Sequence, residues 1–442
     1  MSLEELFSFM DTERVLTSVD ELVLYSYDAA PRRCMPAAVL KPVDEEEVVE
    51  LLRVCAENGL RITPRGAGTS LCGASVPSER TVVVDFTLMN RILEVDEDNR
   101  YVLAEPGVVY GELNRALAGY GLFFPPDPAS GSVCTIGGMV AMNSSGMRAV
   151  RYGTTRNYVS SLRVVLSSGE VLSLGGRYVK SSSGYDLLSL FVGSEGTLGL
   201  FTRVGLRVLP KPEHAEMVCA EFETAEQACR AVLPLLKRTH LLSVAELMDA
   251  SVVNATGGER ALEGWQGGAV LLCESEGFSS SAVLEEARAA EEVLRRHGGR
   301  LLGADSEQVW SCRRGALPAL AELAENLLLE DVTVPVSALP EMLRAIEEVS
   351  EKHGVRIAVF GHAGDGNLHP TFLWDGEKAP ESAIEELFRR CISLGGTLSG
   401  EHGIGTEKRR FMRLEHGRAL ELMRRIKQAA DAAGMLNPGK VV

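Results

Sequence analysis

The segment TPRGAGTSLCG, residues 63–73, decides the fold of the N-terminal half of this chain. Its glycines let the main chain approach a ligand closely, and successive backbone N–H groups can form a nest for an anion such as a pyrophosphate. A P-loop is excluded because no lysine follows Gly73, and a Rossmann fingerprint is excluded because the residues after Gly68, TSLCGASVPSER, have no helical period. For this segment taken alone, an ordinary surface loop is the alternative.

The composition is that of a soluble globular protein and excludes several classes of function. The 442 residues are enough for two or more domains. The 45 Lys and Arg against 61 Asp and Glu give a formal charge of −16, which argues against nonspecific binding to nucleic acid or anionic lipid. The nine cysteines form no C-x-x-C pair, so we expect neither a disulfide framework nor a cysteine-ligated iron–sulfur cluster. No apolar run approaches about 20 residues and the N-terminus lacks a basic region, so we expect no integral membrane segment, no signal peptide and a cytoplasmic location.

Helix and strand patterns alternate along the chain, which predicts the α+β class. In the N-terminal half the expected helices are 44–58 and 109–121, and the expected strands are 80–86, 101–108 and the hairpin 162–174. Two prolines near residue 210 mark the expected domain boundary. Helical segments then lie between apolar strands, which predicts helices packed on an antiparallel sheet, and a last helix is expected over 417–433.

Two further glycine-rich segments accompany the first one. They are PPDPASGSVCTIGGMVAMNSSGMRAVRYGTTRNYV (125–159), with irregular chain expected over 130–157, and FVGSEGTLGLFT (191–202). Together with PRGAGTSLCG they resemble the FAD-binding domain of the vanillyl-alcohol oxidase / p-cresol methylhydroxylase superfamily. The rest of the chain resembles the glycolate oxidase subunit and D-lactate dehydrogenase branch of that superfamily, so the likeness covers roughly residues 20–442.

The resemblance implies a fold of α+β class with a two-subdomain FAD-binding domain of the p-cresol methylhydroxylase type (PCMH-type). An α+β substrate or cap domain with an antiparallel sheet would follow, and then a C-terminal helical segment. The expected ranges are 1–33 for an N-terminal helical segment, 34–212 for the FAD-binding domain, 213–410 for the substrate or cap domain, and 411–442 for a C-terminal segment returning to the flavin.

The resemblance also implies which residues hold FAD. Residues 63–73 would cradle the pyrophosphate, Gly137–Gly138 and Asn143 would line the flavin, and residues 193–199 would approach the adenosine half. In the closing segment NPGK, Asn437 or Lys440 would reach the flavin. The expected cofactor-binding residues are Pro64, Arg65, Gly66, Ala67, Gly68, Thr69, Ser70, Gly73, Pro126, Asp127, Thr135, Gly137, Gly138, Asn143, Ser144, Gly146, Gly196, Thr197, Leu198 and Asn437. No histidine precedes His214, so attachment of the flavin through a histidine in this half is excluded and noncovalent FAD is expected.

Two histidines in the segment GHAGDGNLHP, residues 361–370, suggest a second site. An apolar strand precedes His362 and another contains His369, and Asp365-Gly366 between them is a hairpin signal, so the two imidazoles should lie side by side. A metal site needs such convergence and an anionic third ligand, which the segment LSGEHGIG (398–405) offers. In an extended chain the neighbouring Glu401 and His402 would point in opposite directions. Ordinary hydrogen-bonded histidines are the alternative.

The family resemblance assigns roles to these residues. It implies that His362, His369 and Glu401 hold a divalent cation, zinc or manganese, and that His402 is the general base. It also implies that Arg313, in VWSCRRGALPAL (309–320), binds the substrate carboxylate. A bidentate guanidinium suits a carboxylate, although a solvent-facing arginine pair is the alternative from the residues alone.

These assignments predict FAD-dependent oxidation of a small 2-hydroxy acid, such as glycolate, D-lactate or D-2-hydroxyglutarate, to the 2-oxo acid. The cation would lower the pKa of the hydroxyl, His402 would remove its proton, and the C2 hydride would pass to flavin N5. One alternative is a flavin-binding subunit of a multi-chain complex that depends on a separate iron–sulfur partner, and another is a metal hydrolase without flavin. The electron acceptor is open and includes an iron–sulfur or electron-transfer protein; a homodimer is compatible with the sequence, and no nucleic-acid partner is expected.

Overall fold

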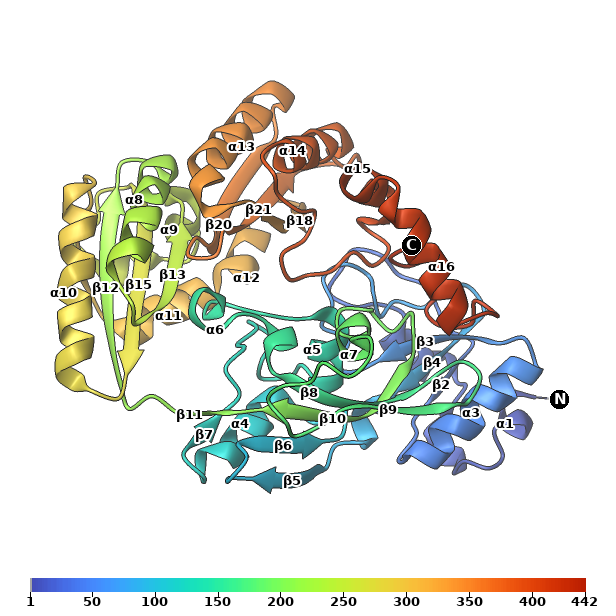
Figure 1. Cartoon of the computed structure of the whole chain (residues 1–442). Coiled ribbons are helices and arrows are strands. Elements are labelled where there is room, and N and C mark those ends of the chain that lie inside the picture. Colours follow the sequence, from blue (N-terminus) through green and yellow to red (C-terminus); the bar gives the residue numbers. More distant parts are fainter. Residues whose placement is uncertain (1) are drawn as a thin grey trace. The chain divides into compact units, whose positions relative to one another are not determined.

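The computed structural model describes residues 2–442 and divides into two compact units (Figure 1). Unit 1 comprises the chain up to Ser145, Thr154–Lys211 and Glu401–Val442, and unit 2 comprises Gly146–Gly153 and Pro212–Gly400. This division differs from the sequence-based domain ranges at three places. The short segment 146–153 and Pro212 group with unit 2, and residues 401–410 group with unit 1.

The first sheet of unit 1 has four strands in the order β1-β2-β4-β3, of which β2, β4 and β3 are parallel. Its strands are β1 (Val15–Leu16), β2 (Ala38–Leu40), β3 (Arg61–Arg65) and β4 (Thr81–Asp85), and the accompanying helices are α1 (Leu3–Leu6), α2 (Val19–Leu22) and α3 (Glu45–Glu57). Asp44 caps α3 by accepting a backbone N–H of its first turn at 2.9 Å. Val48, Leu51 and Leu52 form an apolar stripe that packs into the core of this sheet. The helix predicted over 44–58 is therefore confirmed.

The second sheet of unit 1 has five strands in the antiparallel order β5-β6-β10-β8-β9. The strands are β5 (Ile92–Asp96), β6 (Tyr101–Ala104), β8 (Val159–Val165), β9 (Val171–Gly175) and β10 (Leu200–Arg207), with the helices α4 (Tyr110–Ala118) and α7 (Leu187–Phe191) and the small ladder of β7 (Leu122–Phe123) with β11 (Leu209–Pro210). The expected hairpin over 162–174 is present as β8 and β9. The mainly parallel first sheet and the antiparallel second sheet form the two subdomains that the resemblance implied.

Irregular chain was predicted over 130–157, and this is wrong for α5 (Ile136–Met142). Thr135 caps this helix by accepting the Gly138 N–H at 3.2 Å, and Ile136, Met139 and Val140 are buried on one side of it. Burial of these apolar side chains outweighs the low helix propensity of the two glycines in the first turn. A second short helix, α6 (Ala149–Tyr152), lies in the segment that groups with unit 2.

Unit 2 is built on an antiparallel sheet with the strand order β16-β12-β15-β13-β20-β21-β18, and β19 also pairs with β21. The strands are β12 (His214–Phe222), β13 (Leu242–Met248), β15 (Ala269–Gly277), β16 (Arg300–Leu301), β18 (Asn326–Leu329), β19 (Val332–Thr333), β20 (Arg356–His362) and β21 (Asn367–Trp374), with β14 (Leu262–Glu263) and β17 (Gly303–Ala304) in a separate ladder. The prediction of helices on an antiparallel sheet is confirmed for this half of the chain.

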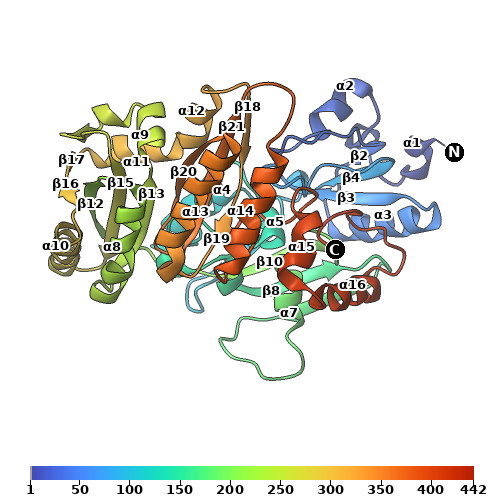
Figure 2. The ribbon, with the colours of Figure 1, turned by 90° about the horizontal axis from the view of Figure 1, so that it is seen from above.

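Helices cover both faces of the unit 2 sheet, as Figure 2 shows. One layer contains α8 (Ala225–Arg238), α10 (Ser280–Arg296), α13 (Leu339–His353) and α14 (Glu381–Ser393), and the other contains α9 (Ala250–Ala255), α11 (Ser306–Arg314) and α12 (Ala316–Ala321). The second layer closes an apolar core in which Trp310 and Leu320 pack with Phe360 of β20. Arg313 of α11 therefore approaches the sheet from this layer of helices.

The C-terminal segment returns to the first sheet of unit 1. After α15 (Met412–His416) and α16 (Ala419–Ala430), Met435 O accepts the Ile62 N–H at 2.9 Å and the Asn437 N–H donates to Ile62 O at 2.7 Å. The last helix was predicted over 417–433, so its centre is confirmed and its ends are shorter. These bonds place Asn437 beside β3, the strand that leads into the first glycine-rich loop.

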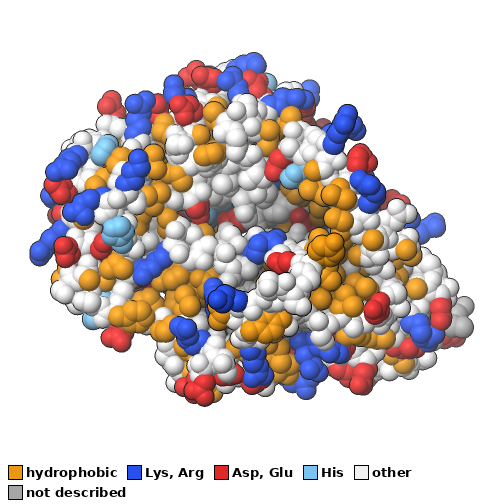
Figure 3. Space-filling model, in the orientation of Figure 1, with side chains coloured by type: hydrophobic (Ala, Val, Ile, Leu, Met, Phe, Trp, Pro, Cys, Tyr) orange, Lys and Arg blue, Asp and Glu red, His pale blue; other side chains and the backbone are white. Residues whose placement is uncertain are grey.

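The chain between residues 2 and 442 contains no helix of sufficient length and apolar character to cross a membrane. On the face drawn in Figure 3, Lys and Arg side chains are interspersed with Asp and Glu side chains.

Candidate functional site

The first and second glycine-rich segments meet in unit 1. A Cβ atom on Gly66 would lie 2.2 Å from Thr135 Oγ1, so this position has no room for a side chain. Thr135 is the residue that caps α5, and the loop after β3 therefore passes directly against the N-terminus of that helix. Arg65 anchors the beginning of the loop, because its Nη1 donates to Tyr27 O at 2.8 Å. Burial lowers the pKa of this arginine.

The third glycine-rich segment joins the same place. Gly196 has a φ of +66°, and a Cβ there would lie 2.3 Å from Pro64 Cγ of the first loop. The buried Glu195 accepts the backbone N–H groups of Ile404 and Gly405 at 2.7 and 2.8 Å, and burial raises the pKa of its carboxyl. Three segments that are far apart in sequence thus contact one another through backbone and small residues.

The closing segment completes this convergence. Asn437 Nδ2 donates to Ala74 O at 3.0 Å and to Glu195 O at 2.7 Å, and Asn437 Oδ1 accepts from Lys440 Nζ at 2.8 Å. Burial lowers the pKa of Lys440 to about 8. The expected cofactor-binding residue Asn437 is therefore placed with the glycine loops, where its side chain ties two of them together.

Two other expected cofactor residues have different surroundings. Asn143 Oδ1 accepts from Thr154 Oγ1 at 3.0 Å and from the Arg156 N–H at 2.9 Å, which holds the turn after α5. Gly146 groups with unit 2, one residue beyond the limit of unit 1. The side chain of Asn143 thus has a structural task that its position in the motif did not reveal.

In unit 2, the strands β20 and β21 form the hairpin that the sequence predicted. Their register pairs His362 with Asn367 and Phe360 with His369, so the two histidines lie on one face as diagonal neighbours. The imidazole centroids are 5.0 Å apart with planes at 89°, and both side chains are buried. Gly366 in the connecting loop has a φ of +87°, and a Cβ there would lie 2.1 Å from Val334 O.

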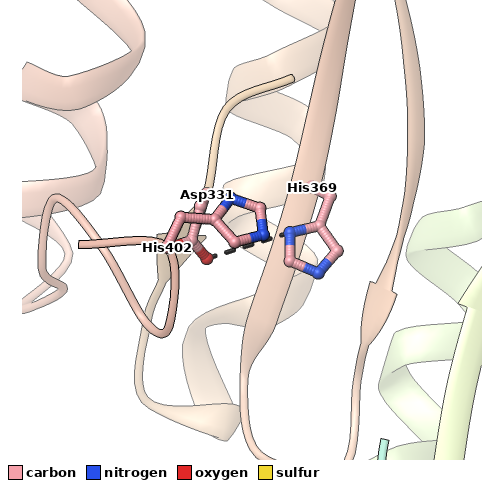
Figure 4. A group of neighbouring side chains, drawn as sticks. All are labelled: Asp331, His369 and His402. Atoms are coloured by element: carbon pink, nitrogen blue, oxygen red, sulfur yellow. Dashed lines mark ion pairs between the residues drawn. The ribbon is translucent and has the colours of Figure 1, made fainter. Parts of the chain in front are cut away.

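Two buried carboxylates lie next to the histidines, and the sequence analysis identified neither of them. Glu246 Oε1 lies 2.5 Å from His362 Nδ1, and Glu246 Oε2 accepts from Arg313 Nε at 2.6 Å. Asp331 Oδ1 lies 3.8 Å from His369 Nδ1, an ion pair that Figure 4 draws. The signal that could have found them is an acidic residue inside an apolar strand pattern, LSVAELM for Glu246 and LLLEDVTV for Asp331.

Asp331 belongs to a polar network at the end of the hairpin. It accepts from Asn367 Nδ2 and from Ser399 Oγ, each at 2.5 Å, and Asn367 Nδ2 also donates to Thr333 Oγ1 at 2.7 Å. Asn367 Oδ1 is buried and has no hydrogen-bond partner in the described protein. An orphaned acceptor beside two imidazoles is a group that a bound ligand or water can satisfy.

The segment that carries Glu401 and His402 begins where unit 2 ends. A Cβ on Gly400 would lie 2.2 Å from Asn367 Nδ2, so the last residue of unit 2 passes directly over the hairpin network. Glu401 Oε2 accepts from Ser145 Oγ at 2.9 Å. His402 Nε2 lies 3.7 Å from Glu401 Oε1, so the two side chains do not point in opposite directions as an extended chain would require. The backbone bends at residues 400–402, and Gly403, which follows, has a φ of +85°.

Arg313 is the only buried lysine or arginine among the described residues of unit 2. Besides Nε, its Nη2 contacts Glu246 Oε2 at 2.5 Å, and its guanidinium lies 4.7 Å from the ring centroid of Phe360. The structure thus brings Arg313 and His362 to the same carboxylate.

Comparisons with known proteins agree with this architecture. Residues 36–175 match a family described as "FAD binding domain", and residues 211–441 match "FAD linked oxidases, C-terminal domain". The glycolate oxidase subunit GlcD of Bacillus subtilis (strain 168) is 38% identical over 433 residues, which is 95% of this chain and 92% of that protein. A D-lactate dehydrogenase of Archaeoglobus fulgidus is 36% identical, with 95% of each chain covered.

Solved structures show the same fold at low identity. The structure of p-cresol methylhydroxylase with substrate bound has a TM-score of 0.81 at 18% identity and covers 100% of this chain and 96% of that one. An alkyldihydroxyacetonephosphate synthase has a TM-score of 0.79 at 20% identity and covers 99% of this chain and 84% of that one. With a PCMH-type FAD-binding domain followed by an α+β domain, the chain belongs to the FAD-linked oxidases, as its resemblance to the vanillyl-alcohol oxidase / p-cresol methylhydroxylase superfamily predicted.

Proposed function

We propose that this chain oxidises a small 2-hydroxy acid to the 2-oxo acid, with FAD as the electron acceptor and a divalent cation at the paired histidines. The observation that carries the proposal is the buried pair His362 and His369 on one face of the unit 2 sheet, next to the buried guanidinium group of Arg313. The names of several relatives, glycolate oxidase subunit and D-lactate dehydrogenase, support a 2-hydroxy acid as the substrate.

The residues of unit 1 fit FAD. The loops carry glycines, such as Gly66 and Gly196, at positions where a side chain would collide with the neighbouring loop. The buried hydroxyls of Thr63 and Ser194 have no hydrogen-bond partner in the described protein, which leaves polar groups for a ligand to satisfy. When bound, FAD supplies a two-electron acceptor and the cation supplies a Lewis acid. We propose that the loop 64–73, the N-terminus of α5 and the segment 196–198 hold the cofactor, with Asn437 fixing their arrangement.

A matched pair of glycine substitutions tests this cradle. Gly196 and Gly59 have φ values of +66° and +63°, so alanine at either position costs about 1–2 kcal/mol of backbone strain. Only at Gly196 would the new methyl group lie 2.3 Å from the ring of Pro64, whereas a Cβ at Gly59 meets nothing within 4 Å. Gly196→Ala should therefore lose FAD during gel filtration, and Gly59→Ala should retain it, as measured by flavin absorbance per chain. Equal retention in the two variants would contradict the proposed cradle.

The cation is proposed to bind His362, His369 and Glu401. Two neutral imidazole nitrogens and one carboxylate oxygen are donors that suit zinc, and the same set with open positions suits manganese. Glu401 follows Gly400 in the chain, and Gly400 has no room for a side chain beside Asn367 of the hairpin. Covalent continuity thus supports Glu401 as the third ligand.

His402 and Arg313 are proposed to act on the substrate. His402, next to the proposed ligand Glu401, would remove the hydroxyl proton, a step that contributes about 10²–10⁴-fold to rate in other enzymes. Arg313 would attract the carboxylate. Since its Nε and Nη2 contact Glu246, Nη1 is the guanidinium nitrogen that remains for an anion.

The substrate class is tested by anaerobic reduction of bound FAD in the isolated chain. Glycolate, both enantiomers of lactate and both enantiomers of 2-hydroxyglutarate are mixed with the protein, and loss of flavin absorbance is followed by stopped flow. We expect rapid reduction by at least one of these acids and, for the chiral ones, by one enantiomer only, because a carboxylate clamp, a cation and a base fix three points of the substrate. Failure of every 2-hydroxy acid to reduce the FAD-loaded, metal-loaded chain would refute the proposed activity.

A second candidate, a flavin subunit that depends on a partner chain, is favoured by one observation: several of the relatives, including the one from Bacillus subtilis, are named as subunits. The same experiment separates the two functions. Reduction in the isolated chain shows that the catalytic residues are complete here, whereas a flavin that is reduced only after a partner is added assigns them in part to that partner.

A further inference from the structure

We propose that Glu246 is a positioning residue for the cation site: it holds the ring of His362 so that Nε2 is the nitrogen presented to the metal. The inference rests on the proposed function, which makes His362 a ligand, and adds an acid that no motif in the sequence indicated. Glu246 lies in β13, far in sequence from either histidine segment, and its side chain is fully buried.

The sheet register places Glu246 directly behind His362. The pairs Glu246↔His362 and His362↔Asn367 form one row across β13, β20 and β21. Direct cross-strand partners point to the same face with Cβ atoms about 4.5–5.5 Å apart. The pairing of the two strands therefore brings the carboxylate to the imidazole, and no loop is needed to position either group. The 2.5 Å contact between Glu246 Oε1 and His362 Nδ1 is thus fixed by regular structure.

The second oxygen of Glu246 favours one direction for that hydrogen bond. Oε2 accepts from the guanidinium of Arg313, and this permanently charged partner stabilises Glu246 as a carboxylate, which can only accept hydrogen bonds. Beside a carboxylate, Nδ1 of His362 donates, and the lone pair of the neutral ring is then on Nε2. A carboxylate behind a metal-binding histidine typically fixes the tautomer and ring orientation and raises the basicity of the ligand nitrogen.

A rival explanation is that Glu246 only balances the charge of Arg313. In that case removal of the acid would weaken cation binding through repulsion by an uncompensated guanidinium, and the ring of His362 would be irrelevant. The two explanations differ in one variant: when Arg313 is also made neutral, repulsion disappears but the loss of the Nδ1 acceptor remains.

The test uses full-length, FAD-loaded protein stripped of metal and titrated with Zn²⁺ against a chromophoric chelator. Glu246→Met, which leaves no acceptor for Nδ1, should weaken Zn²⁺ binding by about 10–100-fold, and the Co²⁺-substituted protein should show an altered d–d spectrum. The matched control is Glu276→Met, at a buried acid of the same sheet that accepts from Tyr152 OH at 2.6 Å and touches no imidazole; it should bind Zn²⁺ like the unmodified chain. The double variant E246M/R313M should remain as weak as E246M.

Each result has one meaning. Recovery of Zn²⁺ affinity in E246M/R313M, or unchanged affinity in E246M, overturns the positioning role while the proposed cation site stands. If the unmodified chain and His362→Ala bind Zn²⁺ equally, the cation site of the proposed function itself is wrong. Should E246M fail to fold, Glu246→Asp retains the charge and withdraws the carboxylate from Nδ1, and a loss of affinity of the same order is expected; full affinity in that variant would overturn the inference.

Discussion

Replacing His402 with asparagine should lower kcat by about 10²–10⁴-fold, the usual contribution of a positioned base, and should leave FAD and metal content unchanged. The proposed role of His402 is to take the hydroxyl proton as the substrate is oxidised, and asparagine keeps a polar side chain of similar size without a basic nitrogen. Its effect should therefore fall on kcat and kcat/KM together, because an interaction made only in the transition state is removed. Stopped-flow reduction of bound FAD measures this step without contributions from the electron acceptor.

The chain provides a matched control for this substitution. His416 follows Glu415 as His402 follows Glu401, and the two Glu–His pairs have similar separations, 3.6 Å and 3.7 Å between Nε2 and Oε1. His416 lies on the short helix α15 and not in the glycine-rich segment. His416→Asn should keep the full rate. Equal rates for His402→Asn and the unmodified chain would show that the base is another group.

The hairpin with the paired histidines was predictable because its information is local. Two apolar strands with an Asp-Gly turn between them specify both the pairing and the shared face, and the observed strands β20 and β21 have this arrangement. The FAD-binding half was predictable for a different reason. Its glycine-rich segments occur where backbone must pass backbone, and the contacts of Gly66 and Gly196 show that constraint directly.

The surroundings of the histidines were not predictable, because they depend on register between distant strands. Glu246 is 116 residues from His362, and only the order of strands in the sheet makes them neighbours. The same limit explains α5, whose glycines suggest a loop and whose buried Ile136 and Met139 make it a helix. The direction of Glu401 and His402 was missed for another reason: the alternation rule holds for extended chain, and the chain bends at residues 400–402.

His362→Ala should remove the cation and the activity together. The substitution deletes one of three proposed ligands, so the loss of metal affinity should exceed the about 10–100-fold that removal of an outer partner costs. Without a Lewis acid at the hydroxyl, a loss of several kcal/mol of transition-state stabilisation is expected, which corresponds to about 10³-fold in rate. Elemental analysis of the purified protein and FAD reduction in the same preparation measure the two effects.

The variant should also be less stable than a surface change would make it. Glu246 would lose the donor of its 2.5 Å contact while remaining fully buried, and an unsatisfied buried acceptor costs about 1–3 kcal/mol. The control is His353→Ala, which removes a partly exposed imidazole whose Nε2 lies 2.9 Å from Glu386 in the helical layer of the same unit. We expect that control to keep metal and turnover. If His362→Ala keeps its metal but loses turnover, His362 contacts the substrate and is not a ligand of the cation. Metal content and turnover must therefore be measured in the same preparation.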